Sequence, residues 1–303
     1  MANPANRLTR GARLQQMLSW CLAAALTFLA GQAQSFELAP FKDRLFAYPG
    51  ILESRDGGAY LIVDYDEVRD INRRDQVPER RVKRKYVDLS PRRRQSDQVL
   101  QTSAGEIRFI AVGDPRNARI VTMYVHGRGG DRKQGTNDYT FGGNFNRIKN
   151  LMLRNNGIYI APDGGELDEA AAQRIRHLVL AVLRQLREAK IVLACGSAGG
   201  TVCHALAGDD AIAARMAGMA LLGSFGDESF IGSAAWRHRV PLLIAHGAAD
   251  SVIPFANAES FYRALRDTPG YPVRLVRFET GGHGTPIRMT DWRETINWML
   301  AAR

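Results

Sequence analysis

From residue 106 to the C-terminus, the chain alternates between short runs of aliphatic residues and longer amphipathic segments. Most of the short runs lack the polar alternation of a strand with one wet face, which is typical of strands buried on both faces of a parallel sheet. Strands of this kind in alternation with helices predict an α/β architecture with the sheet between two layers of helices. The predicted strands are 106–113, 119–127, 157–162, 190–196, 218–225, 241–247 and 273–279.

The clearest helix is predicted over 167–189, where one stripe is apolar and acidic residues occupy the first turn. Two further helices are predicted over 257–267 and 290–302, the second with Thr290 as its N-cap. In open sheets of parallel strands, functional sites form beyond the carboxyl ends of the strands. The loops that follow the predicted strands are therefore where chemistry is expected.

A glycine-rich corner, "ACGSAGG", ends the strand at 190–196 and places Ser197 before a helix. A nucleophile on a sharp strand-to-helix turn is held in a strained conformation with its hydroxyl exposed, and it needs small neighbours. Gly199 and Gly200 meet that need, whereas Cys195 stands where glycine is usual and is interpreted as a tolerated small residue. For the corner taken alone, the alternative is an anion site formed by helix N–H groups.

Two later loops supply the partners that a serine nucleophile needs. Asp250 follows the strand at 241–247, and His283 lies between glycines after the strand at 273–279. A serine hydroxyl is a weak nucleophile that is activated by a histidine base, which an acid orients. The sequence therefore predicts Ser197, Asp250 and His283 as catalytic residues, with Asp163 as an alternative acid.

The loop "HGRGG", which ends the strand at 119–127, is expected to complete the site. Backbone N–H groups that face a developing oxyanion stabilise the transition state of acyl transfer. The predicted donors are the N–H of Ala198 and an N–H of this loop, from Arg128 or Gly127. His126 is expected to shape the turn rather than to bind a metal, because no second ligand lies at metal spacing.

Together, the motifs "HGRGG", "CGSAGG", "HGAADSVIP" and "GGHG" resemble those of the α/β-hydrolase superfamily, over the chain from about residue 84 onward. The resemblance implies a mostly parallel central sheet of about eight strands, with helices on both faces. The short spacings from Ser197 to Asp250 and from Asp250 to His283 leave no room for a large lid domain.

The expected reaction is hydrolysis of a carboxylic ester through an acyl-enzyme, which needs no metal or organic cofactor. A thioesterase or a serine peptidase would use the same groups. The competing class is a non-catalytic, hydrolase-like protein that binds the cell envelope. The expected substrate is a small-molecule or lipid-like ester. The loop 131–147 is expected to line the substrate pocket through Tyr139, Phe141 and Asn144. The alternative is that this loop is a plain surface connection.

The first 33 residues have the pattern of a secretory signal peptide. Arginines precede an apolar run at 17–30, and small residues follow it at Gly31 and Ala33. Cleavage after Ala33 and export, to a bacterial periplasm, are expected. An uncleaved membrane anchor and a cytoplasmic protein with an unusual N-terminus are the alternatives.

Residues 34–83 are interpreted as a basic extension with edge strands, and residues 84–303 as the catalytic domain. The formal net charge is +10, and many of the cations fall within 73–94. The strand signal "RKYVDLS" favours a solvated edge strand or hairpin for this basic stretch, with an anionic envelope surface as the alternative partner. Nucleic acid is not expected, because no recognition motif accompanies the charge.

Two cysteines, Cys195 and Cys203, lie eight residues apart on either side of the glycine-rich corner. Pairing is expected to distort that corner. The sequence therefore predicts two small buried thiols rather than a disulfide.

Overall fold

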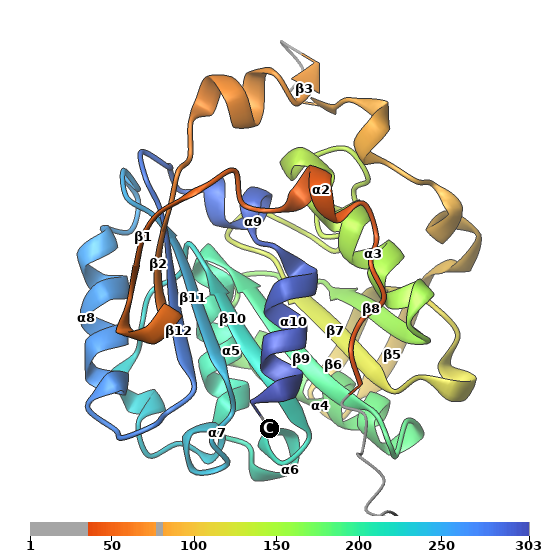
Figure 1. The fold of residues 1–303 in the computed structure, drawn as a ribbon. Coiled ribbons are helices and arrows are strands. Elements are labelled where there is room, and N and C mark those ends of the chain that lie inside the picture. The colour runs from red at the N-terminus through yellow and green to blue at the C-terminus, as the bar shows by residue number, and fades with distance from the viewer. Residues whose placement is uncertain (1–35, 77–80, 303) are drawn as a thin grey trace, which may run out of the picture. The chain divides into compact units, whose positions relative to one another are not determined.

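The predicted strands and helices form a central sheet with helices on both faces (Figure 1). This computed structural model describes residues 36–76 and 81–302. The strands are β1 (Ile51–Arg55), β2 (Tyr60–Val63), β3 (Asp75–Gln76), β4 (Arg81–Val82), β5 (Gln95–Thr102), β6 (Gly105–Val112), β7 (Ile120–Val125), β8 (Gly157–Pro162), β9 (Lys190–Gly196), β10 (Met216–Leu222), β11 (Leu242–Gly247) and β12 (Val273–Phe278). In the described residues, β3 and β4 pair with each other, and the remaining ten form one sheet.

The order of strands in the large sheet is β1-β2-β12-β11-β10-β9-β7-β8-β6-β5. From β2 to β8 the neighbours are parallel, whereas β1, β6 and β5 are antiparallel to the strands they join. This arrangement confirms the mostly parallel sheet. It brings the carboxyl ends of β7, β9, β11 and β12 to the same edge, because parallel strands all end there.

The two faces of the sheet are covered by different helices. The helices are α2 (Asp43–Phe46), α3 (Asn144–Arg154), α4 (Glu169–Gln185), α5 (Gly200–Ala207), α6 (Asp210–Ala213), α7 (Ala234–Arg237), α8 (Phe255–Arg266), α9 (Thr285–Met289) and α10 (Trp292–Ala301). The helices α3 and α10 contact each other on one face, and α4 and α5 contact each other on the opposite face (Figure 1).

Alternation along β7 shows how the core is divided between these layers. Val121, Met123 and Val125 join the apolar cluster that includes α4, α5 and α8. Tyr124 points the other way and packs against Phe145 of α3, with ring centroids 4.7 Å apart. Residues of both sets are buried, which explains why the sequence shows no alternation of apolar and polar residues there.

The sequence located the central strands well but gave the outer ones less completely. The predicted strands at 157–162 and 190–196 have the observed bounds of β8 and β9, and the other five differ only at their ends. Edge strands were expected within 34–83 without bounds, and β1 and β2 lie there; β5 was not predicted. With these three strands the sheet has ten strands rather than about eight. The strand signal at 84–90 is wrong: a 3₁₀ turn, Arg84–Tyr86, turns the Tyr86 ring into a small apolar cluster with Phe46.

The N-terminal region belongs to the same compact unit, which runs from Glu37 to Arg303. The strand β2 pairs in parallel with β12, and β1 forms the sheet edge next to it. Residue 84 therefore does not divide an extension from a catalytic domain. The predicted signal peptide lies outside the described residues. No helix within 36–76 and 81–302 is both long and apolar enough to cross a bilayer.

At the start of α10, the N-cap is Asp291 rather than the predicted Thr290. The Asp291 side chain accepts a hydrogen bond from the N–H of Glu294. The Thr290 hydroxyl instead donates to the Pro286 carbonyl at 2.7 Å, at the end of α9.

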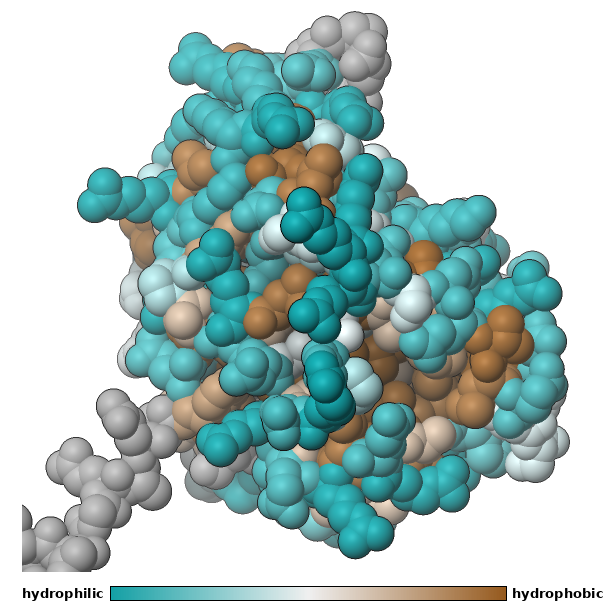
Figure 2. Space-filling view, turned by 90° about the vertical axis from the view of Figure 1, so that its right-hand side faces the viewer, coloured by the Kyte–Doolittle hydropathy of each residue, from teal (hydrophilic) through white to brown (hydrophobic). Residues whose placement is uncertain are grey.

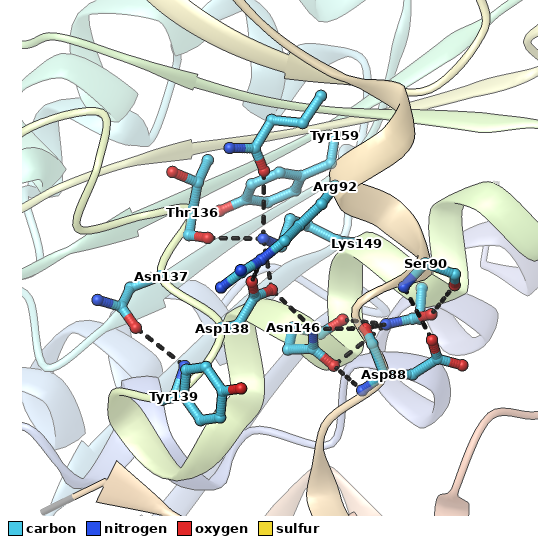
Figure 3. A network of polar contacts seen from close by, with 12 residues as sticks. Asp88, Ser90, Arg92, Thr136, Asn137, Asp138, Tyr139, Asn146, Lys149 and Tyr159 are labelled. Atoms are coloured by element: carbon cyan, nitrogen blue, oxygen red, sulfur yellow. Dashed lines mark hydrogen bonds and ion pairs between the residues drawn. The ribbon is translucent and has the colours of Figure 1, made fainter. Parts of the chain in front are cut away.

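The helix α3 begins inside the predicted loop 131–147, and residues 144–152 are all buried. Its polar side chains bind other polar groups (Figure 3). The Lys149 ammonium lies 2.7 Å from an Asp138 carboxylate oxygen and donates to the Thr136 carbonyl at 2.6 Å. Asn146 donates to the same Asp138 oxygen at 2.7 Å, and Arg92 binds the other oxygen. Because these buried positions are polar, the apolar pattern of a core helix is weak in the sequence.

Candidate active site

The corner at the end of β9 holds Ser197 in a rare backbone conformation. Its φ is 50°, which lies in the left-handed region that non-glycine residues seldom adopt. A 3₁₀ turn, Ser197–Gly199, leads from this residue into α5. A Cβ on Gly199 would lie 2.5 Å from the His126 carbonyl oxygen, so the close approach of the β7 end requires glycine. The Ser224 hydroxyl, which sequence reasoning missed, donates to the Ser197 carbonyl at 2.7 Å.

The structure brings Ser197, His283 and Asp250 together in one hydrogen-bonded chain. The Ser197 Oγ lies 2.8 Å from His283 Nε2, and His283 Nδ1 lies 2.8 Å from Asp250 Oδ2. A carboxylate can only accept, so Nδ1–H donates to Asp250 and a neutral ring has its acceptor at Nε2. The serine hydroxyl therefore donates to a nitrogen that is able to take its proton.

The carboxylate of Asp250 is fully buried and fixed by backbone groups. Its Oδ1 accepts hydrogen bonds from the N–H groups of Val252 at 2.8 Å and Ile253 at 3.0 Å. Burial raises the pKa of Asp250, but the hydrogen bonds from Ile253 and His283 outweigh it and hold the pKa below its ordinary value. Asp250 is consequently a carboxylate at neutral pH.

A second histidine, His246 at the end of β11, contacts the same carboxylate. Its Nε2 lies 2.8 Å from the Ile253 carbonyl oxygen and 3.2 Å from Asp250 Oδ2. Both neighbours are acceptors, so Nε2 carries the proton. Burial lowers the pKa of His246, which favours the neutral ring. The sequence interpretation treated His246 as structural; its position four residues before Asp250 was the available signal.

The loop after β7 lies directly against the serine. A Cβ on Gly127 would lie 2.9 Å from the Ser197 Cβ. The buried His126 accepts from the Gly164 N–H at Nε2, so its Nδ1–H donates to the Gly127 carbonyl at 2.8 Å. In a trans peptide the next N–H points opposite to the carbonyl, so the Arg128 N–H points away from the His126 ring. The turn is thus shaped by His126.

The expectation of two free thiols is wrong: Cys195 and Cys203 form a disulfide. Alternation along β9 places Cys195 on the face that α5 covers, and Cys203 lies on α5, with the two Cα atoms 6.2 Å apart. This separation is ordinary for a disulfide, so the corner accommodates the bond without distortion. The cross-link joins the strand before Ser197 to the helix after it.

A cavity of about 440 Å³ opens beside His283. Phe141 is among the residues that line it. Asn144 is not, because it is buried and donates to the Ile287 and Thr290 carbonyls. Tyr139 is also absent from the lining, and its ring lies under the Arg81 guanidinium. Part of the wall comes from the N-terminal region, which the sequence interpretation had set apart: Tyr65, Glu67 and Ile71.

The alternative acid is engaged elsewhere. Asp163 accepts from the backbone N–H of Arg132 at 2.8 Å and forms an ion pair with its guanidinium at 2.7 Å. This leaves Asp250 as the carboxylate that His283 contacts. Within 36–76 and 81–302, no group of three or more His, Cys, Asp or Glu side chains is arranged to hold a metal ion.

No protein-family model and no curated protein matches the sequence. Solved structures do match. A thermostable esterase is similar with a TM-score of 0.55 and 16% identity over 69% of this chain, which spans only 63% of that protein. A mutant of the feruloyl esterase module from Clostridium thermocellum, complexed with sinapinate, has a TM-score of 0.54 and 14% identity, covering 73% of this chain and 92% of that one.

A putative α/β hydrolase of unknown function from Agrobacterium tumefaciens is also similar, with a TM-score of 0.54 and 13% identity. The match covers 68% of this chain and 95% of that one. At these identities the likeness concerns the fold alone: the chain has the α/β-hydrolase fold, and its described residues, 36–76 and 81–302, contain no large lid domain.

Proposed function

We propose that this chain is a serine hydrolase that cleaves carboxylic esters through an acyl-enzyme intermediate. One observation carries the proposal: the unbroken chain of hydrogen bonds from Ser197 through His283 to Asp250, with 2.8 Å at each step. The strained backbone of Ser197 and the position of all three residues at the carboxyl ends of strands support it.

In the proposed reaction, Ser197 Oγ attacks the ester carbonyl carbon while His283 Nε2 takes the hydroxyl proton. The buried Asp250 carboxylate stabilises the imidazolium that forms. Collapse of the tetrahedral intermediate breaks the bond to the alcohol oxygen, which receives the proton from His283. Water then attacks the acyl-enzyme with His283 as base, and the acid and free Ser197 are released. The chain's own groups perform every step, so the mechanism needs no metal or organic cofactor.

Backbone N–H groups stabilise the oxyanion in this proposal. Ala198 supplies one, because its N–H directly follows the nucleophile. The other comes from the loop that packs against Ser197, from Arg128 or Gly127. The hydrogen bond from His126 to the Gly127 carbonyl favours Arg128, since it fixes the peptide plane that carries the Arg128 N–H.

A panel of p-nitrophenyl esters of increasing chain length, measured beside thioesters and amides, tests the function. Ester turnover that falls by orders of magnitude in Ser197→Ala and His283→Ala, while the melting temperature stays unchanged, supports the proposal. Faster thioester or amide turnover would reassign the substrate class to a thioesterase or a serine peptidase. If neither variant alters any turnover, the chain is not a serine hydrolase of this type, and a non-catalytic envelope-binding protein becomes the better account.

We also propose that the protein is exported, to a bacterial periplasm. The Cys195–Cys203 disulfide supports this proposal, because such bonds persist mainly in oxidising compartments. Fractionation of cells that express the full chain, with N-terminal sequencing of the product, tests it. A mature N-terminus near residue 34 in the periplasm is expected. A full-length product in the membrane fraction would mean an uncleaved anchor, and one in the cytoplasm would overturn export.

A further inference from the structure

The excess positive charge lies in one short segment, residues 81–94, which we call the basic strip. Of the formal net charge of +10, three charges come from arginines before residue 36 and one from Arg303, so residues 36–302 carry +6. The basic strip alone contains seven lysines and arginines and a single carboxylate, Asp88, which also gives +6. The rest of that range is therefore neutral, and the charge of the fold is concentrated on the strip.

The strip is anchored to the rest of the fold. Two of its cations contact carboxylates of other segments: Arg92 binds the buried Asp138, and Arg94 lies 3.5 Å from Asp114. All seven lysines and arginines are exposed, whereas Val82 and Tyr86 are buried beneath them. The Lys42 ammonium donates to the Lys85 carbonyl at 2.8 Å, and the Asp88 N–H and carbonyl bind the Asn146 side chain. The strip lies on the right of Figure 1, and Figure 2 shows hydrophilic side chains gathered down the middle of that face.

The side chains of the strip indicate which class of partner it binds. A row of exposed cations on a segment that is anchored at several points matches a planar array of phosphates, which many headgroups present at once. The strip's one aromatic ring, Tyr86, is buried, so no ring is available to stack on nucleic-acid bases. None of its residues is an exposed large hydrophobic side chain, so insertion into the acyl layer has no support. We propose that the basic strip docks the protein on an anionic phospholipid surface through the headgroup phosphates.

Docking there would place the cavity beside the headgroup layer. The Arg81 guanidinium lies 3.5 Å above the Tyr139 ring, and the Val82 N–H donates to the Tyr139 carbonyl at 3.0 Å. Two residues further along the chain, Phe141 lines the cavity beside His283. A lipid-like ester held at the surface would then be concentrated next to Ser197. This consequence rests on the proposed function, whereas the docking itself does not.

Co-sedimentation of the full-length protein with vesicles tests the proposal. Vesicles of phosphatidylcholine alone are compared with vesicles that contain one third phosphatidylglycerol, at 50 and 500 mM salt. The test variant carries Arg84→Gln, Lys85→Gln and Arg93→Gln. The control carries Arg184→Gln, Arg187→Gln and Arg266→Gln, three exposed arginines on or next to α4 and α8, so both variants lose the same net charge.

We expect binding to the anionic vesicles at low salt only, and a loss of about a hundredfold in partition coefficient for the strip variant. The control should bind within a few-fold of the wild type. Equal losses in both variants would mean that net charge alone attracts the protein, and no wild-type binding would overturn the proposal. Tighter binding to a single-stranded 20-mer DNA than to vesicles would reassign the strip to nucleic acid. Turnover of a soluble short-chain ester should be the same in all three proteins, which separates this test from the proposed function.

Discussion

The disulfide between Cys195 and Cys203 gives a stability prediction that can be worked from the chain itself. The bond closes a loop of eight residues, and the loss of chain entropy in the unfolded state corresponds to about 2.5 kcal/mol of stabilisation. The oxidised and reduced wild-type proteins have the same side chains, so the comparison isolates the cross-link from the packing of the sulfur atoms.

Urea unfolding at equilibrium, with and without a strong thiol reductant, measures this difference. With a slope of about 3 kcal/mol/M, the reduced protein should unfold at a urea concentration lower by about 0.8 M. The control is Cys195→Ala with Cys203→Ala, whose midpoint should not respond to the reductant. Identical midpoints for the wild type in both states, or free thiols mapped to both Cys195 and Cys203 in the unfolded protein without reductant, would refute the cross-link.

Three further predictions concern the site and its support. Gly127→Ala should lower kcat on a p-nitrophenyl ester by a factor of about 10²–10³ with little change in melting temperature, because the added Cβ would displace the loop from Ser197. An unaltered kcat would contradict the placement of the loop. His246→Gln should lower kcat about ten- to hundredfold with KM unchanged, because a hydrogen bond to the buried Asp250 carboxylate is weakened. A change in KM alone would mean that His246 acts in substrate binding. Asp138→Asn should lower the free energy of unfolding, measured by urea denaturation, by about 3–5 kcal/mol, because the buried Lys149 loses its counter-charge. A loss below about 1 kcal/mol would contradict the role of this buried ion pair.

The last of these predictions has a pH dependence of known sign. Burial raises the pKa of Asp138, but Lys149 and the hydrogen-bonding side chains outweigh it, so the folded pKa lies below the ordinary value of 3.8. Ionised Asp138 therefore contributes its full stability above pH 3.8, and this contribution is lost as the pH falls through the folded pKa. The stability gap between the wild type and Asp138→Asn should shrink in acid, and a gap that widens there would contradict the assignment.

The sequence predicted those parts of the fold whose pattern is apolar. β8 and β9 were located to the residue because both are buried on two faces, and Ser197, Asp250 and His283 followed from the loops that such strands position. The helix α3 was missed because many of its buried positions are filled by asparagine, arginine and lysine, whose partners come from distant segments.

Two other features depend on contacts that a linear pattern does not show. The disulfide requires knowing that Cys195 faces α5, which the spacing of eight residues did not indicate. The cavity wall formed by residues 65–71 depends on how the N-terminal segment crosses the end of the sheet near α9 (Figure 1). Both arise from packing between elements rather than from the elements themselves.

The central claim is that Ser197 is an activated nucleophile, and covalent labelling tests it most directly. The purified protein is incubated with a fluorophosphonate, and the site of modification is mapped by peptide mass spectrometry. The account predicts one adduct, on the peptide that contains Ser197, and no adduct in Ser197→Ala or after denaturation. An intact protein that remains unlabelled, or an adduct on another residue that persists in Ser197→Ala, would contradict it.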